Sequence, residues 1–288
     1  MLYLGVLLIL ISSLCFVLSI YFGKIVTTTT SMTAVVTSFS RLLIGAIIMA
    51  IYMVATKKTF KSKDFKPVAS RAFLNSFSII LSSWAIKYTT ITNANMLHMT
   101  YPVFVILLAP FITKEKNNKS NYIYLFIIML GSYIVSNPSF SNINVGDAAS
   151  IGSAIFSALS IFALTMARKN NEGYLIVFYV MFIGIFINFP FAYRDLSTFD
   201  SNGIVPVLLS AFSGFFGQVF LTWGYKYVDS ATGSLLSTSR IFMATGIGVL
   251  FLSEPINTRI IIGMILISLT LIGLSGYFDK YKNKTDII

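Results

Sequence analysis

Ten long apolar stretches, separated by short polar or charged breaks, make up most of this 288-residue chain. A helix needs about 20 apolar residues to span the roughly 30 Å hydrocarbon core of a bilayer, and its backbone polar groups must be satisfied there without water. The pattern therefore predicts an all-α membrane protein with ten transmembrane helices. The predicted spans are residues 3–23, 32–55, 68–87, 91–112, 121–137, 147–167, 174–193, 204–225, 231–252 and 260–278.

The composition supports membrane embedding. The chain is 56% hydrophobic and only 11% charged, whereas a soluble domain carries about 25% charged residues. A net charge of +11 raises the question of nucleic acid, but the basic residues fall between apolar runs and form no patch interleaved with aromatic residues. The single cysteine, Cys15, and the single histidine, His98, provide neither a disulfide framework nor a metal cluster. We therefore expect no cofactor, no metal and no enzyme activity, with the lipid bilayer and a small-molecule substrate as partners and no nucleic acid.

The basic residues gather in alternate breaks, and this asymmetry predicts the orientation, because lysine and arginine are retained on the cytoplasmic side during insertion. With the N-terminus inside, the cytoplasmic segments hold Lys57, Lys58, Lys61, Lys63, Lys66, Arg71, Lys114, Lys116, Lys119, Arg168, Lys169, Lys226, Lys280, Lys282 and Lys284. The opposite side holds Lys24, Lys87, Arg194 and Arg259. We predict a multi-pass protein of the inner or plasma membrane of the cell, with both termini cytoplasmic.

The second half of the chain repeats features of the first. A shift of 139 residues aligns Trp84 with Trp223, Lys87 with Lys226, Tyr88 with Tyr227, Leu97 with Leu236 and Glu115 with Glu254. A shift of 141 residues aligns Leu18-Ser19-Ile20 with Leu159-Ser160-Ile161. Because each repeat has an odd number of helices, the second copy enters the membrane upside down, as in transporters built from inverted repeats. We predict two inverted five-helix repeats (5+5), one in residues 1–140 and one in residues 141–288.

Two segments carry a resemblance to a known family. The segment NANMLHMTYPVFVILLAPFITKE, which ends at Glu115, and the segment GSLLSTSRIFMATGIGVLFLSE, which ends at Glu254, resemble the fourth helix of each repeat in the EamA-type drug/metabolite transporter superfamily. The first copy has the central proline of that pattern, Pro102, and the second has Ile241 instead. Arg240, Arg41 and the pair Glu254-Pro255 resemble the branch that includes S-adenosylmethionine and riboflavin carriers. The resemblance covers nearly the whole chain and implies the same ten-helix fold.

Two arginines, Arg41 and Arg240, lie about nine residues into their predicted spans, which at about 1.5 Å per residue puts both near the midplane. An arginine at that depth costs about 2.5–3.5 kcal/mol on insertion scales, and all ten acidic residues lie in loops or at span ends. Arg240 is either a clamp on a carboxylate or phosphate group or a residue bonded to Ser237 or Ser239 and to backbone carbonyls. For Arg41 we favour a structural bridge between helices.

Further candidates follow from the repeat. His98 and Tyr101 match Ser237 and Arg240 at the 139-residue shift, so we expect the two sets to face one central cavity. Because the unperturbed pKa of histidine is about 6.5, His98 is either a proton relay or a neutral hydrogen-bonding residue.

Four other side chains complete the predicted substrate site, each with a structural alternative. Trp84 and Trp223 lie near span ends, where interfacial aromatic anchors are usual, and substrate stacking is the alternative. Asn95 and Gln218 are polar residues inside predicted spans that either orient a substrate or form hydrogen bonds between helices.

Together these features predict a secondary transporter that moves a small zwitterionic or anionic metabolite by alternating access. The substrate is expected to be amino-acid-like, S-adenosylmethionine-like or vitamin-like. An exporter of drugs or toxic metabolites, a membrane enzyme and a non-transporting scaffold or receptor are the alternatives. Proton coupling and exchange both stay open, as do a monomer and a homodimer.

Overall fold

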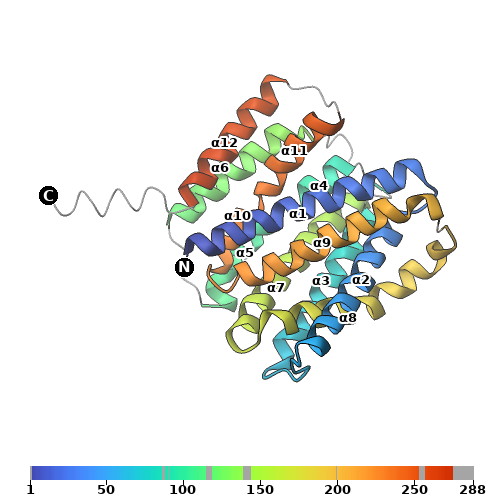
Figure 1. The fold of residues 1–288 in the computed structure, drawn as a ribbon. Coiled ribbons are helices and arrows are strands. Elements are labelled where there is room, and N and C mark those ends of the chain that lie inside the picture. Colours follow the sequence, from blue (N-terminus) through green and yellow to red (C-terminus); the bar gives the residue numbers. More distant parts are fainter. Residues whose placement is uncertain are drawn as a thin grey trace.

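The computed structural model describes residues 2–85, 88–89, 91–114, 119–138, 144–198, 200–252 and 257–274, and within these ranges all regular secondary structure is helical (Figure 1). The helices are α1 (Leu2–Thr29), α2 (Ala34–Ala55), α3 (Phe65–Ala85), α4 (Ile91–His98), α5 (Tyr101–Ile112), α6 (Lys119–Ser136), α7 (Val145–Asn170), α8 (Gly173–Ala192), α9 (Ile204–Gly224), α10 (Ser230–Ser237), α11 (Ser239–Leu252) and α12 (Thr258–Leu274). Two short 3-10 helices, η1 (Tyr193–Thr198) and η2 (Ser201–Gly203), connect α8 to α9. Some residues named in the sequence analysis lie outside the described ranges, namely Lys87, Glu115, Lys116, Glu254, Pro255, Lys280, Lys282 and Lys284.

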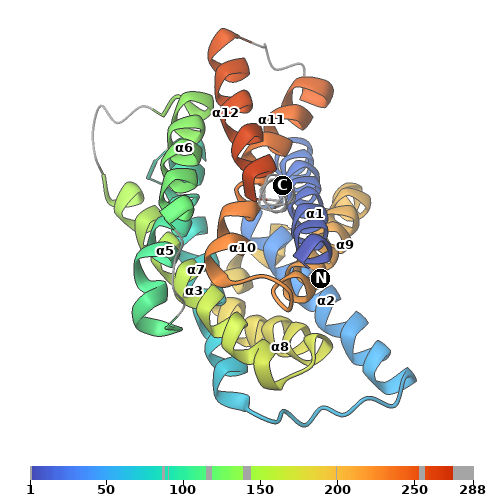
Figure 2. The same cartoon turned by 90° about the vertical axis from the view of Figure 1, so that its left-hand side faces the viewer.

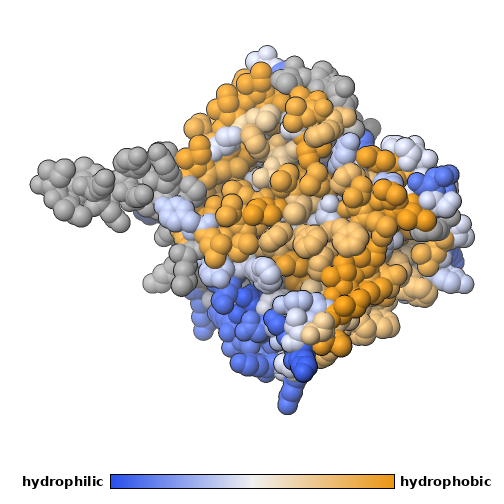
Figure 3. All heavy atoms as spheres, viewed as in Figure 1, coloured by the Kyte–Doolittle hydropathy of each residue, from blue (hydrophilic) through white to orange (hydrophobic). Residues whose placement is uncertain are grey.

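Within the described ranges, seven helical stretches are long and apolar enough to cross a membrane, and α12 is apolar but shorter. Large apolar side chains such as Phe111, Phe126 and Leu250 are exposed on the outside of the bundle. Figure 3 shows hydrophobic residues across the middle of one face, with hydrophilic residues gathered at the lower left and at the right. Because a water-soluble protein rarely exposes so large an apolar surface, the chain is a multi-pass helical membrane protein.

The fourth and ninth predicted spans are each broken into two helices, which the apolar pattern did not predict. Met99 and Thr100 separate α4 from α5, and Thr238 separates α10 from α11. At both breaks a threonine hydroxyl donates to a carbonyl of the preceding helix, from Thr100 Oγ1 to Leu97 O and from Thr238 Oγ1 to Leu235 O, each at 2.6 Å. Such local side-chain bonds compete with the helical ladder.

Helices from the two halves of the chain pack against each other along antiparallel seams of small residues. In the α1–α9 seam, Ser12 Oγ donates to Gly217 O and Ser19 Oγ donates to Ser210 O, both at 2.7 Å. Residue numbers rise along α1 as they fall along α9, so the two helices are antiparallel. Small residues at these positions let the backbones approach closely and satisfy the hydroxyl groups inside the protein.

The α3–α7 seam repeats this arrangement. Ser78 Oγ donates to Ser153 O at 3.0 Å, and Arg71 Nη1 donates to Ser160 Oγ at 2.7 Å. The residue shifts found in the sequence relate the two seams to each other. A shift of 141 matches α1 positions with α7 positions, and a shift of 139 matches α3 positions with α9 positions. The matched positions are Ser12 with Ser153, Ser19 with Ser160, Arg71 with Ser210 and Ser78 with Gly217.

The helix α10 breaks this symmetry. It contacts α5 and α6 of the first half, whereas α4, its counterpart, makes no comparable contact with α11 or α12 in the part of the chain that the structure describes. Figure 2, which looks at the end of the bundle that carries the N-terminus, shows α10 near the centre of the ring of helices. At this end α10 therefore connects the second half of the chain to α5 and α6 of the first half, a connection that α4 does not make to a comparable extent to α11 or α12 among the described residues.

Candidate functional site

The two helix breaks bring the halves of the chain together near the middle of the bundle. Tyr101, the first residue of α5, is buried, and its hydroxyl donates to Ser234 O of α10 at 3.3 Å. Arg240 is the second residue of α11, whereas Tyr101 is the first residue of α5. The predicted match between the two therefore differs by one residue when positions are counted from the start of each helix. The difference arises because the first break takes two residues and the second takes only Thr238.

Arg240 lies at the start of α11 with its guanidinium over an aromatic ring. The guanidinium carbon is 4.2 Å from the centroid of the Phe16 ring of α1, a cation–π contact. Its Nε is buried and has no hydrogen-bond partner among the described residues. Because an unpaired buried donor is costly, this N–H is available to an acceptor on a bound molecule. The predicted alternative, a bond to Ser237 or Ser239, is not formed: Ser237 Oγ donates to Gly233 O at 2.9 Å, and Ser239 Oγ has no partner in the described chain.

Three arginines share this region. Arg240 interacts electrostatically with Arg41 of α2 and with Arg71 of α3. Arg41 packs its aliphatic stem against Gly214 of α9, so its side chain contacts both α2 and α9. No carboxylate among the described residues forms an ion pair or a hydrogen bond with any of the three guanidinium groups. The region is therefore strongly positive and without an acidic partner.

Arg71 was counted among the cytoplasmic residues, and the structure shows that its side chain is buried within the protein. The side chain is only 3% exposed and sits in the α3–α7 seam, with Nη1 bonded to Ser160 Oγ and Nε unpaired among the described residues. The physical reason is that α3 begins at Phe65, so Arg71 lies in its second turn and is covered by the antiparallel α7. The predicted span from residue 68 already included Arg71, and that position could have identified it as a buried arginine.

Tyr225 is a second residue that the sequence did not identify. It follows α9 directly, is buried, and has a hydroxyl without a hydrogen-bond partner in the described chain. It interacts electrostatically with Tyr101, Arg71 and Arg240, and its ring lies against Gly233 of α10, where an added Cβ would be 2.6 Å from the ring. No sequence signal distinguishes this tyrosine, because it falls at the end of a predicted span.

His98, the last residue of α4, joins the same region. Its Nδ1 is 2.9 Å from Ser153 Oγ of α7, its ring centroid is 6.1 Å from that of Tyr101, and it interacts electrostatically with Arg240. The structure therefore brings Arg240, Tyr101 and His98 together, and it adds Arg71 and Tyr225 to them.

The other predicted site residues lie elsewhere or in less defined positions. Trp84 and Trp223 are 39% and 43% exposed, which suits interfacial anchors better than substrate stacking. Asn95 is exposed on α4. Gln218 is buried in α9, and its Nε2 has no partner among the described residues.

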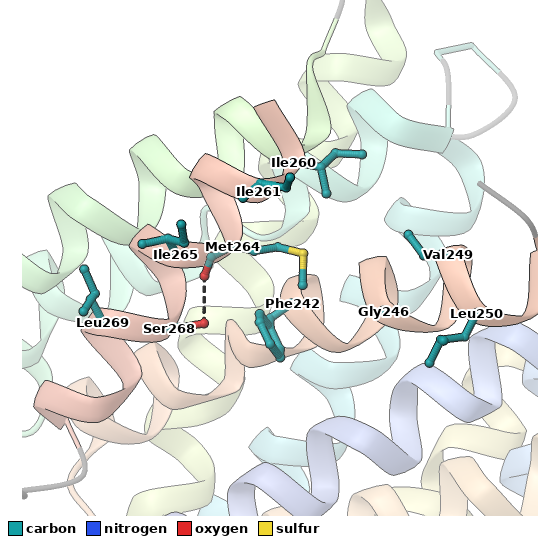
Figure 4. Close-up of a pocket in the computed structure, with 10 residues that line it drawn as sticks. All are labelled: Phe242, Gly246, Val249, Leu250, Ile260, Ile261, Met264, Ile265, Ser268 and Leu269. Atoms are coloured by element: carbon teal, nitrogen blue, oxygen red, sulfur yellow. Dashed lines mark hydrogen bonds between the residues drawn. The ribbon is translucent and has the colours of Figure 1, made fainter. Parts of the chain in front are cut away.

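A groove between α11 and α12 is the wrong kind of site for a polar substrate. Its volume is about 450 Å³, and its walls come from apolar residues such as Phe242, Met264 and Leu269 (Figure 4). The hydroxyl of Ser268 is already bonded to Met264 O at 2.7 Å. The groove carries no charge, so the arginine-rich region at the helix breaks is the candidate binding site.

Broken membrane helices around a charged centre define a class of multi-pass membrane protein that handles polar solutes. The chain belongs to the EamA-like transporter family, which matches residues 3–137 and again residues 144–276. This confirms the resemblance to the drug/metabolite transporters and makes the protein a membrane transporter.

Individual relatives are distant but cover most of the chain. An uncharacterized transporter of Helicobacter pylori is 25% identical over 96% of this chain and 97% of its own length. The pseudopaline exporter of Pseudomonas aeruginosa is 24% identical over 82% of this chain and 84% of its own. A crystal structure superposes with a TM-score of 0.76 at 12% identity, covering 96% of this chain and 98% of that one, which shows a shared fold.

Proposed function

We propose that this protein is a secondary transporter for a small metabolite that carries at least one carboxylate or phosphate group. The observation that carries the proposal is the set of three arginines, Arg41, Arg71 and Arg240, which have no carboxylate partner among the described residues. A guanidinium presents forked donors that match the planar oxygens of such groups. A substrate anion supplies the negative charge that the protein itself does not.

We infer that the chain forms ten membrane spans arranged as two inverted five-helix repeats, in residues 1–140 and 141–288. The helices α3, α6 and α12 complete the set of spans. The equivalence of the α1–α9 and α3–α7 seams supports this arrangement, since an internal two-fold relation exchanges them. The two successive matches to one family support it as well.

Alternating access then follows from the asymmetry of α10. In the present conformation α10 packs on α5, and the Tyr101–Ser234 bond holds the two halves together on the side of the helix breaks that faces the N-terminus. In the alternative conformation these contacts separate, and α4 packs on α11 at the opposite end. Residues at the breaks, including Arg240, stay between the halves in both conformations.

The binding region favours a zwitterionic or anionic substrate over a cationic drug. A proton-coupled exporter of cationic drugs needs an intramembrane carboxylate that binds either the drug or a proton. The described residues of the arginine cluster include no carboxylate. Similarity to an exporter of pseudopaline favours export as the direction. Amino-acid-like, S-adenosylmethionine-like and vitamin-like compounds remain the candidate classes.

Binding to matched compounds tests the proposal. Purified protein is screened by thermal shift against pairs made of an acid and its neutral amide, and compounds that bind are then measured as radiolabelled flux in proteoliposomes. We expect the acids to raise the unfolding temperature and the amides to leave it unchanged. Equal shifts for acids and amides, or binding without flux, would overturn the proposed substrate class or the transport function respectively.

A further inference from the structure

A second polar pocket lies at the end of the bundle that carries the N-terminus, away from the helix breaks. Its volume is about 370 Å³, and its walls come from the ends of α1, α2, α7, α8 and α9. It lies next to Arg168, eight residues beyond Ser160 of the α3–α7 seam, which corresponds to about 12 Å along the helix. The pocket is therefore separate from the proposed transport site.

The pocket carries an excess of positive charge. Three cations, Lys58, Arg168 and Lys226, line it together with one carboxylate, Glu172. Arg168 Nη1 donates to Asn171 O at 2.9 Å, while its Nε is buried without a hydrogen-bond partner among the described residues. One guanidinium donor is thus fixed in place by the α7–α8 turn, and another has no acceptor within the described protein.

Lys58 is held by two aromatic side chains. Its Nζ donates to Tyr52 Oη at 2.8 Å and lies 4.9 Å and 4.6 Å from the ring centroids of Tyr52 and Tyr174. The hydrogen bond to Tyr52 raises the pKa of Lys58 above its ordinary value, so the ammonium keeps its charge at neutral pH. The lysine is therefore a positioned cation rather than a freely moving surface charge.

The pocket also has an apolar wall. Leu4 and Leu8 of α1 line it, and Leu4, Tyr52 and Trp223 are among the exposed large apolar side chains of the bundle. Tryptophan and tyrosine are enriched where hydrocarbon meets headgroups. A pocket with cations on one side and, on the other, the exposed Leu4 and the half-buried Leu8 fits a ligand that has an anionic head and an apolar tail.

We propose that this pocket binds the phosphate of an anionic phospholipid, with the acyl chains lying along Leu4 and Leu8. The phosphate oxygens accept from Arg168 Nε and neutralise Lys58 and Lys226. Basic pockets between membrane helices are suited to such headgroups. Because Lys226 and Tyr227 lead directly into α10, the lipid also fastens the connection to the helix that contacts α5 and α6.

The test is native mass spectrometry of the full chain, purified in detergent and supplied with phosphatidylglycerol or phosphatidylcholine. We compare the unmodified protein with a Lys58→Gln, Lys226→Gln double variant. The matched control is Lys61→Gln, Lys66→Gln, which removes two exposed lysines at the same end that do not line the pocket. We expect phosphatidylglycerol to be retained and phosphatidylcholine to be lost. The pocket variant should weaken phosphatidylglycerol binding by roughly 30-fold, which corresponds to about 2 kcal/mol, and the control should not.

Several results would overturn the proposal. Equal retention of the two lipids, or equal weakening by the pocket and control variants, would mean that the pocket does not select an anionic headgroup. Competition experiments distinguish a lipid from a soluble anion. If inorganic phosphate displaces phosphatidylglycerol as effectively as a second phospholipid does, the pocket binds a soluble anion instead. If the double variant does not fold, the single variants Lys58→Gln and Lys226→Gln carry the test, each with an expected weakening of roughly 5-fold.

Discussion

Replacing Arg240 with glutamine should move substrate binding and protein stability in different directions. In the protein without substrate, Arg240 lies near two other arginines, and its buried Nε has no partner among the described residues. Its favourable contact is with the Phe16 ring, which contributes about 0.5–2 kcal/mol. Glutamine carries no charge, so the cost of burying a charged side chain is removed and the repulsion from Arg41 and Arg71 is relieved. We therefore expect the unfolding temperature without substrate to stay unchanged or to rise.

Binding should respond in the opposite sense. A hydrogen bond to a charged group contributes about 1.5–3 kcal/mol, so Arg240→Gln should weaken binding of the anionic substrate by roughly 10- to 150-fold. Arg240→Lys should restore little, because an ammonium cannot reproduce the bidentate fork. Isothermal calorimetry or a thermal-shift titration in detergent measures the affinity, and a melting curve without ligand measures the stability.

Arg71→Gln is the matched comparison within the same cluster. Arg71 donates to Ser160 Oγ in the α3–α7 seam, so its loss should lower stability by about 1–3 kcal/mol even without substrate. If Arg240→Gln instead lowers the unfolding temperature as much as Arg71→Gln and leaves the affinity intact, then Arg240 is a structural residue. The argument for an anionic substrate would then lose its main support.

Three further predictions concern packing, protonation and orientation. Gly263→Ala should destabilise the protein by about 1–3 kcal/mol, because the added Cβ would lie 2.7 Å from Gly131 O in the α6–α12 contact. The control is Gly246→Ala in α11, where the added Cβ meets nothing within 4 Å and should not destabilise the protein in the same melting assay. His98→Asn should retain at least half of the flux in proteoliposomes if the histidine only bonds Ser153, and a loss of flux that tracks the proton gradient would identify it as a proton relay. A cysteine in place of the exposed Lys61 should be protected from an impermeant reagent in intact cells, and ready labelling there would reverse the predicted orientation.

The apolar runs and the repeat were readable from the sequence because both depend on local composition and spacing. Each predicted span coincides with a helix or with a pair of helices on either side of a break. The shifts of 141 and 139 residues match Ser12 with Ser153 and Ser78 with Gly217. They therefore match the contact between Ser12 and Gly217 with the contact between Ser153 and Ser78. Orientation and the two inverted repeats stay predictions, argued from charge placement and from these seams.

The proposed binding region was readable from the sequence only in part. Arg240 stood out because a charged side chain deep in an apolar run needs a partner, and His98 and Tyr101 stood out because the 139-residue shift matches them with Ser237 and Arg240. Arg71 was counted with the cytoplasmic residues although it lies inside the predicted span 68–87, and only the structure shows that its side chain is buried against α7. Tyr225 could not be found, because a tyrosine at a span end is typical of the membrane interface.

The sequence by itself determined that this protein lies in a membrane and where its apolar segments fall, since both follow from which residues are apolar and how they are spaced. Only the tertiary structure decided which polar side chains share one site. Arg41, Arg71, Tyr101, Tyr225 and Arg240 come from helices in both halves of the chain, and they meet because antiparallel seams of small residues set the depth of each helix against its partner. That depth depends on contacts between residues far apart in the sequence, which no local pattern records.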